Sequence, residues 1–160
     1  MTSIQLIVYG DPQPAGSKKA YNIPGQQYPV IVDANPKARG WKDAIAKTCA
    51  VNYGGPLLGG PLTMVVDFYQ PRPKGHFGSG RNAGQVREGA PAYPTIKPDI
   101  DKLSRAVLDG LTGQLYRDDA QIVRKVATKH YGEPARVEIQ VEQIEITVGD
   151  QARSTQLSIA

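Results

Sequence analysis

Four aspartates gather around one short segment of the sequence: Asp99 and Asp101 at its beginning, and Asp118 and Asp119 just beyond its end. Carboxylate oxygens are the ligands of hard cations, and Mg²⁺ is usually held by one or two carboxylates together with water and substrate phosphate. The chain that carries these acids has a formal net charge of +4. Acids that converge within a basic chain are typical of a magnesium-dependent nuclease, in which the acids hold the metal and the cations hold the polyanion.

The segment from about Asp99 to Leu111 predicts an amphipathic helix, in which Asp99 is placed to be the N-cap and Asp101 lies in the first turn. Asp101, Arg105 and Asp109 follow one another at four-residue spacing on its open face. A capped helix with a surface ion pair explains these residues as well as a metal site does, because such pairs are common and weak. The apolar stripe of the helix consists of Ile100, Leu103, Ala106, Val107 and Leu111.

The second acid pair favours the metal interpretation. The strand that follows begins near Gln121, so Asp118 and Asp119 lie at its start. The helix would be about 20 Å long, and the chain has to return alongside it before this pair can meet Asp99. The six residues from Thr112 to Arg117 span that distance if extended, since each reaches about 3.3–3.6 Å. We therefore expect the two pairs to converge on one divalent ion.

The remaining hydrophobic patterns predict the order strand, strand, helix, strand, helix, strand, strand. This order favours an α+β fold: a two-layer sandwich in which a mixed β-sheet carries two main helices on one face. The alternation in the last strand slips by one residue at Gln143, where we expect a bulge or the end of the strand. The strands are predicted at Ile4–Tyr9, Tyr28–Val32, Leu62–Tyr69, Ile122–Tyr131 and Val137–Val148, and the first helix runs from Pro36 to about Val51 with Asn35 as its N-cap.

Residues 71–97 form a long stretch with little periodicity that is rich in Gly and Pro. A loop of this length inside a compact domain is usually functional or disordered. Its cations indicate contact with a nucleic acid backbone, while a solvated loop with incidental cations is the alternative. Phe77 and Tyr93 either stack on unpaired bases or pack down on the protein. The candidate DNA-binding residues are Lys18, Lys19, Arg72, Lys74, Arg81, Arg87, Lys97 and Lys102.

Length and composition are those of one globular domain. We expect residues 1–148 to form this domain and residues 149–160 to be a flexible tail. Cys49 is the only cysteine in the sequence, so no intrachain disulfide can form, and this favours a reducing, cytoplasmic compartment. No stretch approaches the roughly 18 apolar residues of a membrane helix, so we expect no membrane partner.

Around the acids, the sequence resembles a known family. It reads DIDKLSRAVLDGLT from Asp99 and YRDDAQIV from Tyr116. Both stretches are similar to the RusA family of Holliday junction resolvases, many of which are carried by phages and prophages. The close match covers about residues 96–125, and the order of elements extends it loosely over residues 4–147. Two acid pairs at this spacing around an amphipathic helix make a specific motif.

The resemblance implies a homodimeric, Mg²⁺-dependent endodeoxyribonuclease, with Mn²⁺ as a substitute metal, that makes paired nicks in branched DNA (four-way junctions). It places the metal-binding acids of the family on Asp99, Asp101 and Asp119, with Asp118 as a weaker candidate, and the catalytic lysine on Arg105. A phage-encoded enzyme of this kind would act in DNA recombination and repair in the cytoplasm of the bacterial host.

The chain departs from the family pattern at two places, because Lys102 replaces an Asn and Arg105 replaces the catalytic lysine. Arginine keeps its proton at neutral pH, so only an electrostatic or phosphate-clamping role is open to Arg105. Two rival interpretations stay open. The first is a flap or replication-fork nuclease that uses the same acids, and the second is a non-catalytic DNA-binding module whose acids only cap and pair.

Overall fold

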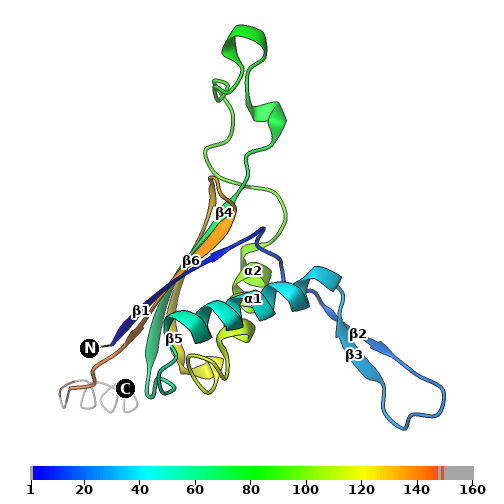
Figure 1. The fold of residues 1–160 in the computed structure, drawn as a ribbon, viewed down its shortest axis with the longest axis vertical. Coiled ribbons are helices and arrows are strands. Elements are labelled where there is room, and N and C mark those ends of the chain that lie inside the picture. Colours follow the sequence, from blue (N-terminus) through cyan, green and yellow to red (C-terminus); the bar gives the residue numbers. More distant parts are fainter. Residues whose placement is uncertain (1, 148, 150–160) are drawn as a thin grey trace, which may run out of the picture.

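The computed structural model describes residues 2–147 and 149. Its body is a four-stranded sheet with the strand order β1-β6-β4-β5 (Figure 1). The β4–β5 pair is parallel and the other pairs are antiparallel, so the sheet is mixed, as predicted. The strands are β1 (Ser3–Tyr9), β4 (Leu62–Gln70), β5 (Ile122–Tyr131) and β6 (Arg136–Gln143).

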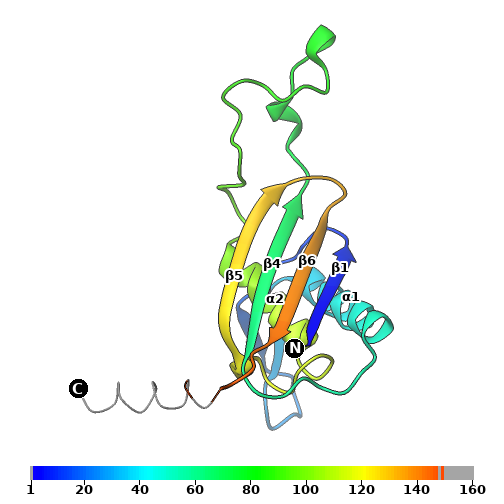
Figure 2. The same ribbon diagram turned by 90° about the vertical axis from the view of Figure 1, so that its left-hand side faces the viewer.

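Two helices, α1 (Pro36–Asn52) and α2 (Ile100–Leu111), lie behind one face of this sheet (Figure 2). The predicted α+β, two-layer arrangement is therefore confirmed. The N-cap of α1 is also as predicted, because the Asn35 side chain accepts a hydrogen bond from the Lys37 amide at 3.1 Å. Within the described residues, no helix has the length and apolar character needed to cross a membrane.

The core lies between the sheet and the two helices, and the alternation of β4 shows how it forms. Leu62, Met64, Val66 and Phe68 are buried toward the helices, while the residues between them lie on the uncovered face. The helices approach each other closely at Gly110, where an added Cβ would lie 3.0 Å from Ile45. The buried residues that α2 contributes are Leu103, Ser104, Ala106, Val107, Gly110 and Leu111.

The predicted end of the last strand needs correction. The last strand ends at Gln143, where its alternation slips, and so it is shorter than the predicted Val137–Val148. The slip therefore marks the end of the strand and not a bulge. Val148 and residues 150–160 lie outside the described residues, so the predicted flexible tail stays a prediction.

A second sheet was not predicted. It consists of β2 (Lys18–Tyr21) and β3 (Val30–Asp33), which pair antiparallel as a hairpin that projects from the body (Figure 1). The strand predicted at Tyr28–Val32 corresponds to β3, but its partner has no apolar alternation in KKAY and so gave no strand signal. Pairing within the hairpin, and not side-chain burial, makes β2 a strand.

Residues 71–97 form a second excursion, which rises from one end of the sheet and which we name the basic projection (Figure 1). It contains two short 3-10 turns, Lys74–His76 and Gly80–Asn82. Hydrogen bonds within the projection hold it in place: the Gly78 amide donates to Gln85 O at 2.8 Å, and Arg87 Nε donates to Phe77 O at 2.8 Å. The projection is thus an ordered loop with little regular secondary structure.

Candidate active site

The start of α2 presents two exposed carboxylates. Asp99 occupies the N-cap position, as predicted, but its side chain makes no capping hydrogen bond. Its Oδ2 instead lies 3.4 Å from Lys102 Nζ, and both side chains are about half exposed. Asp101 is exposed in the first turn of the helix. Neither acid is buried in a structural role, so both remain available to a ligand.

These carboxylates open into a groove of about 1010 Å³. One wall is residues 93–97, where the chain returns from the basic projection, and the other is the stretch Ala127–Lys129 of β5. A smaller hollow of about 360 Å³ lies on the other side of Asp99 and is lined by Lys97 and Lys102. Asp99 is therefore accessible from two sides, with lysines beside it.

Lys129 holds the chain immediately before Asp99 in place. Its Nζ donates hydrogen bonds to Ile96 O at 2.6 Å and to Pro98 O at 2.9 Å. Charge-assisted hydrogen bonds of this kind are stronger than neutral ones. Lys129 was not predicted from the sequence as a site residue. It pairs with the buried Phe68 and so occupies a helix-facing position of β5, where strand alternation would favour an apolar residue.

Asp118 and Asp119 lie in a tight turn that precedes β5. Asp118 caps the 3-10 turn η3 (Asp119–Gln121), since its Oδ1 accepts a hydrogen bond from the Ala120 amide at 2.8 Å. The Gln121 side chain accepts from the Asp118 amide at 3.2 Å and donates to Leu58 O and Gly60 O at 3.0 and 3.1 Å. Asp118 thus has a structural role, while Asp119 is exposed.

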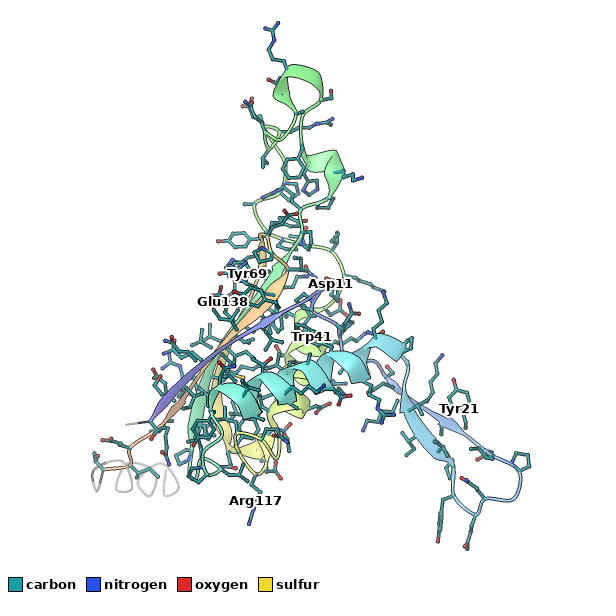
Figure 3. The ribbon with its side chains drawn as sticks, viewed as in Figure 1. Asp11, Tyr21, Trp41, Tyr69, Arg117 and Glu138 are labelled. Atoms are coloured by element: carbon teal, nitrogen blue, oxygen red, sulfur yellow. The ribbon has the colours of Figure 1, made fainter. Side chains whose placement is uncertain are left out.

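The two acid pairs lie at opposite ends of α2. Asp99 lines a hollow together with Gln70, the last residue of β4, whereas η3 leads into Ile122, which pairs with Leu62, the first residue of β4. A helix of the length of α2 measures about 18 Å. Figure 3 shows the same separation: Asp11, which lines that hollow, lies near the upper end of the sheet, and Arg117 lies at the lower end.

The predicted convergence of the four aspartates within one chain is therefore wrong. In the ranges 2–147 and 149, no group of three or more Asp, Glu, His or Cys side chains could hold a metal ion. The assignment of Asp99, Asp101 and Asp119 to metal binding is a separate statement and stays a prediction.

The chain fails to return along α2 because it is anchored at the end of the helix. It turns at Gly113, which has a φ of 79°, and the Gly113 amide donates to Tyr116 O at 2.7 Å. Tyr116 is fully buried, and its hydroxyl donates to Leu108 O at 3.0 Å. Burial, and then the charge of Asp119, raise the pKa of the Tyr116 phenol above its ordinary value, so this hydroxyl keeps its proton.

Arg105 is exposed on α2 and forms no ion pair with Asp101 or Asp109 in the described part of the chain. Asp109 instead pairs with Lys42 of α1 at 2.9 Å, and the same Lys42 Nζ lies 3.0 Å from Asp33 Oδ2 at the end of β3. The surface ion pair expected among Asp101, Arg105 and Asp109 is thus absent from the described residues, whereas Asp99 and Lys102 pair at the start of the helix. The Arg105 guanidinium is left open for an external anion such as phosphate.

The candidate DNA-binding cations fall into two groups. Arg72 and Arg87 brace the basic projection, because Arg72 lies 4.4 Å from the Tyr131 ring centroid and donates to Pro91 O, and Arg87 donates to Phe77 O. Lys74 and Arg81 are exposed and make no such contact among the described residues. The remaining exposed candidates are Lys18 and Lys19 on β2 and Lys97 beside Asp99.

The two loop aromatics also differ. Phe77 is partly buried, and its backbone forms a β-bridge with Val86 inside the projection, whereas Tyr93 is 57% exposed, with its ring centroid 6.1 Å from that of His130. Phe77 therefore packs down on the protein. Tyr93, which lines the groove beside Asp99, is the more accessible of the two.

Comparison with known proteins gives two matches. The profile of the family described as endodeoxyribonuclease RusA matches residues 10–142, a range that contains both acid pairs and the whole basic projection. The chain is also 29% identical over 144 residues to a protein of Bacillus subtilis (strain 168) named uncharacterized protein YqaN. That alignment covers 90% of this chain and 99% of the Bacillus protein.

Proposed function

Because the chain belongs to the RusA endodeoxyribonuclease family, we propose that it resolves four-way DNA junctions by Mg²⁺-dependent paired nicks, in DNA recombination and repair. One observation carries this proposal. Two exposed carboxylates, Asp99 and Asp101, open into a groove at the root of a projection whose cations Lys74 and Arg81 are free to contact DNA. A module that only bound DNA would have no use for carboxylates at this place, because they repel phosphate.

The donor set fits a hard divalent ion. Mg²⁺ is commonly held by one or two carboxylates together with water and substrate phosphate, and Asp99 at the N-cap and Asp101 in the first turn supply two carboxylates at the start of α2. When bound there, Mg²⁺, or Mn²⁺ in its place, would supply Lewis-acid stabilisation of the phosphate and a more acidic water. Lys129 would keep the Asp99 segment in position. Arg105 would neutralise phosphate charge without moving a proton.

A homodimer accounts for the separated acid pairs. Asp118 and Asp119 lie beyond the far end of α2 and cannot reach an ion held at Asp99 of the same chain. In an isologous dimer with the two α2 helices antiparallel, the start of one helix lies beside the end of the other. Asp119 of the second copy would then face Asp99 and Asp101, and each of two equivalent sites would meet one of two opposed DNA strands.

The substrate test compares four synthetic DNAs that share their arm sequences: a four-way junction, a replication fork, a flap and a plain duplex. We expect Mg²⁺-dependent nicks at symmetry-related positions of the junction, with the other three cut far more slowly. Equal or faster cutting of the fork or flap would replace the junction with that substrate. Binding without any cutting, in Mg²⁺ or Mn²⁺, would contradict the enzymatic proposal and favour a DNA-binding module.

A further inference from the structure

The β2–β3 hairpin, with its loop, projects from the body (Figure 1) and leaves large apolar side chains in solvent. One of them is Tyr21, which is labelled in Figure 3. Isolated two-stranded hairpins are at best marginally stable in water. Contiguous exposed apolar surface of this kind marks an interaction site. The exposed apolar residues of the hairpin are Tyr21, Ile23, Tyr28, Val30, Ile31 and Val32, with exposed fractions from 36% to 75%.

Both faces of the hairpin carry exposed apolar residues beyond the lysines at its root. Ile31 pairs with Ala20 on one face, while Val30 and Val32 belong to the other face. A hollow of about 450 Å³ separates Ile31 and Val32 from α1, so the hairpin does not pack on its own helix there. A ribbon with one face in solvent would be expected to be polar on that face. The composition therefore indicates that another surface covers the hairpin.

Beyond Lys18 and Lys19 at its root, the hairpin has no charged residue before Asp33, and this favours protein over DNA as the surface that covers residues 20–32. A segment that binds the DNA backbone needs cations along its length. The cores of protein interfaces, by contrast, are depleted of charge and enriched in aromatic residues such as Tyr, and this segment contains Tyr21 and Tyr28.

The root of the hairpin indicates which protein covers it. Asp33 and Asp109 share Lys42, with N–O distances of 3.0 and 2.9 Å, and the Ala15 amide just before the hairpin donates to Lys102 O at 3.0 Å. The hairpin therefore springs from alongside α2, the helix that separates the two acid pairs. A second copy that packs along α2 would therefore lie next to this hairpin.

We propose that residues 20–32, which we name the dimer arm, pack on a second copy of this chain and hold the two α2 helices side by side. The proposal rests on the proposed function, because the need for a second copy comes from the separated aspartates. In a two-fold dimer each arm makes the same contact, so both arms are covered at once.

The test is the association state, measured by sedimentation equilibrium without DNA or metal. Ile31→Asp places a charge in the middle of the arm, and we expect it to weaken dimerisation by at least about tenfold, since central apolar anchors dominate interface energies. Val51→Asp is the matched control, because Val51 is exposed and apolar (84%) but lies on α1. This control should dimerise as the unmodified chain does, and circular dichroism should show both variants folded.

Three results would contradict the assignment of residues 20–32 to the dimer interface. They are an unmodified chain that is monomeric at all concentrations, an Ile31→Asp variant that dimerises normally, and a Val51→Asp variant that dissociates equally. An Ile31→Asp variant that stays dimeric but loses junction binding would make the hairpin a DNA contact instead. Sedimentation measures only the mass of the assembly, so it tests the arm separately from the enzymatic activity. A dimer that depends on the arm but neither binds Mg²⁺ nor cuts DNA would support the proposed interface and contradict the proposed function.

Discussion

Asp99 and Asp101 differ from Asp109 and Asp118 in what surrounds them. Asp109 is neutralised by Lys42, and Asp118 caps a turn, so their carboxylates already have partners. Asp101 has none among the described residues, and Asp99 has only a half-exposed lysine 3.4 Å away. Four residues of the same type thus divide into structural and available acids by their neighbours alone.

Asp101→Asn tests the metal assignment. It removes a charge that an Mg²⁺ ligand needs and that repels phosphate, so junction cleavage should be lost while junction binding is kept or tightened. The expected loss in rate exceeds the roughly 10–100-fold that follows from loss of a residue supporting a metal ligand. Gel assays of cleavage in Mg²⁺ and of binding in EDTA measure both effects. Glu133→Gln, an exposed acid outside the site, is the control. Cleavage at the normal rate by Asp101→Asn would defeat the assignment.

Lys129→Met tests the role of Lys129 as a positioning residue. It leaves the carbonyls of Ile96 and Pro98 without their donor, so Asp99 should be held less well. We expect the Mg²⁺ concentration for half-maximal cleavage to rise about 10–100-fold, with junction binding in EDTA unchanged. Faster hydrogen exchange of residues 93–98 should accompany this change.

Two further variants complete the Lys129 experiment. Lys129→Arg should recover part of the metal affinity, because it restores a cationic donor. Lys125→Met changes an exposed lysine of the same strand and should have no effect. An unchanged Mg²⁺ requirement in Lys129→Met would show that Lys129 only fills space.

At the scale of elements, α2 sets the spacing of the site and two excursions extend its reach. Arg72 and Arg87 stabilise the conformation of the basic projection, because they donate hydrogen bonds to Pro91 O and Phe77 O, respectively. Lys74 and Arg81 are exposed and make no such contact within the described part of the chain. Cations of the same loop therefore divide into those that shape it and those that can meet phosphate.

Replacing Lys74 and Arg81 with Ala should flatten the salt dependence of junction binding. Each lost phosphate contact reduces the slope of log K against log salt by about 0.9, so the double variant should lose about 1.8. Fluorescence anisotropy at several salt concentrations measures this slope. Lys37→Ala and Lys47→Ala on α1 are controls for net charge. An unchanged slope would remove the projection from the interface.

Lys42 joins α1, α2 and the root of the hairpin, and its titration should be visible in stability. Burial lowers its pKa, but the hydrogen bonds and charges of Asp109 and Asp33 outweigh burial and raise the pKa above its ordinary value. A raised folded-state pKa stabilises the fold below the unfolded pKa, about 10.4 for lysine, and this contribution is lost as pH rises through the folded value.

The corresponding experiment compares Lys42→Met with the unmodified chain in urea unfolding at pH 7, 9 and 11. The variant should be less stable by the same amount at pH 7 and 9, and this difference should shrink at pH 11. The exposed Lys37→Met should show no such pattern. A difference that stays constant up to pH 11 would show that the ion pairs contribute nothing to stability.

At the scale of the whole molecule, the two acid pairs lie at opposite ends of α2, so no single chain brings Asp119 to Asp99. In the proposed dimer, Asp119 of the second copy would add a third carboxylate to Asp99 and Asp101, and the dimer arm would give that copy a place to bind. Symmetry then makes two sites from two chains, each built by both. The substrate has the same approximate two-fold symmetry in the proposed function.

Mixing two inactive variants distinguishes shared sites from separate ones. In a heterodimer of Asp101→Asn and Asp119→Asn, shared sites place both substitutions in one site and leave the other intact. We therefore expect a mixture to regain single-strand nicking of the junction, although each variant alone is inactive. Mixing Asp99→Asn with Asp101→Asn is the control, because every shared site would then keep a defect. If neither mixture cuts, the sites are not shared.

The sequence predicted the strands of the main sheet because burial leaves a period in the chain. The alternation of β4 and the apolar stripe of α2 each indicate that one face of the element is buried in the core. β2 escaped prediction because KKAY is exposed on both faces and owes its conformation to pairing with β3. Lys129 escaped because its hydrogen-bond partners are backbone carbonyls more than thirty residues away.

By itself, the sequence determined which groups can do chemistry and which faces are buried, because residue type and periodicity are local properties. It left open where the chain goes after Leu111, since Thr112 to Arg117 are long enough to return along the helix but not obliged to. Only the tertiary structure decided this, by burying Leu115 and Tyr116 at the end of α2. That packing keeps Asp119 away from Asp99 of its own chain, and so it turns a predicted one-chain site into a proposed site between two copies.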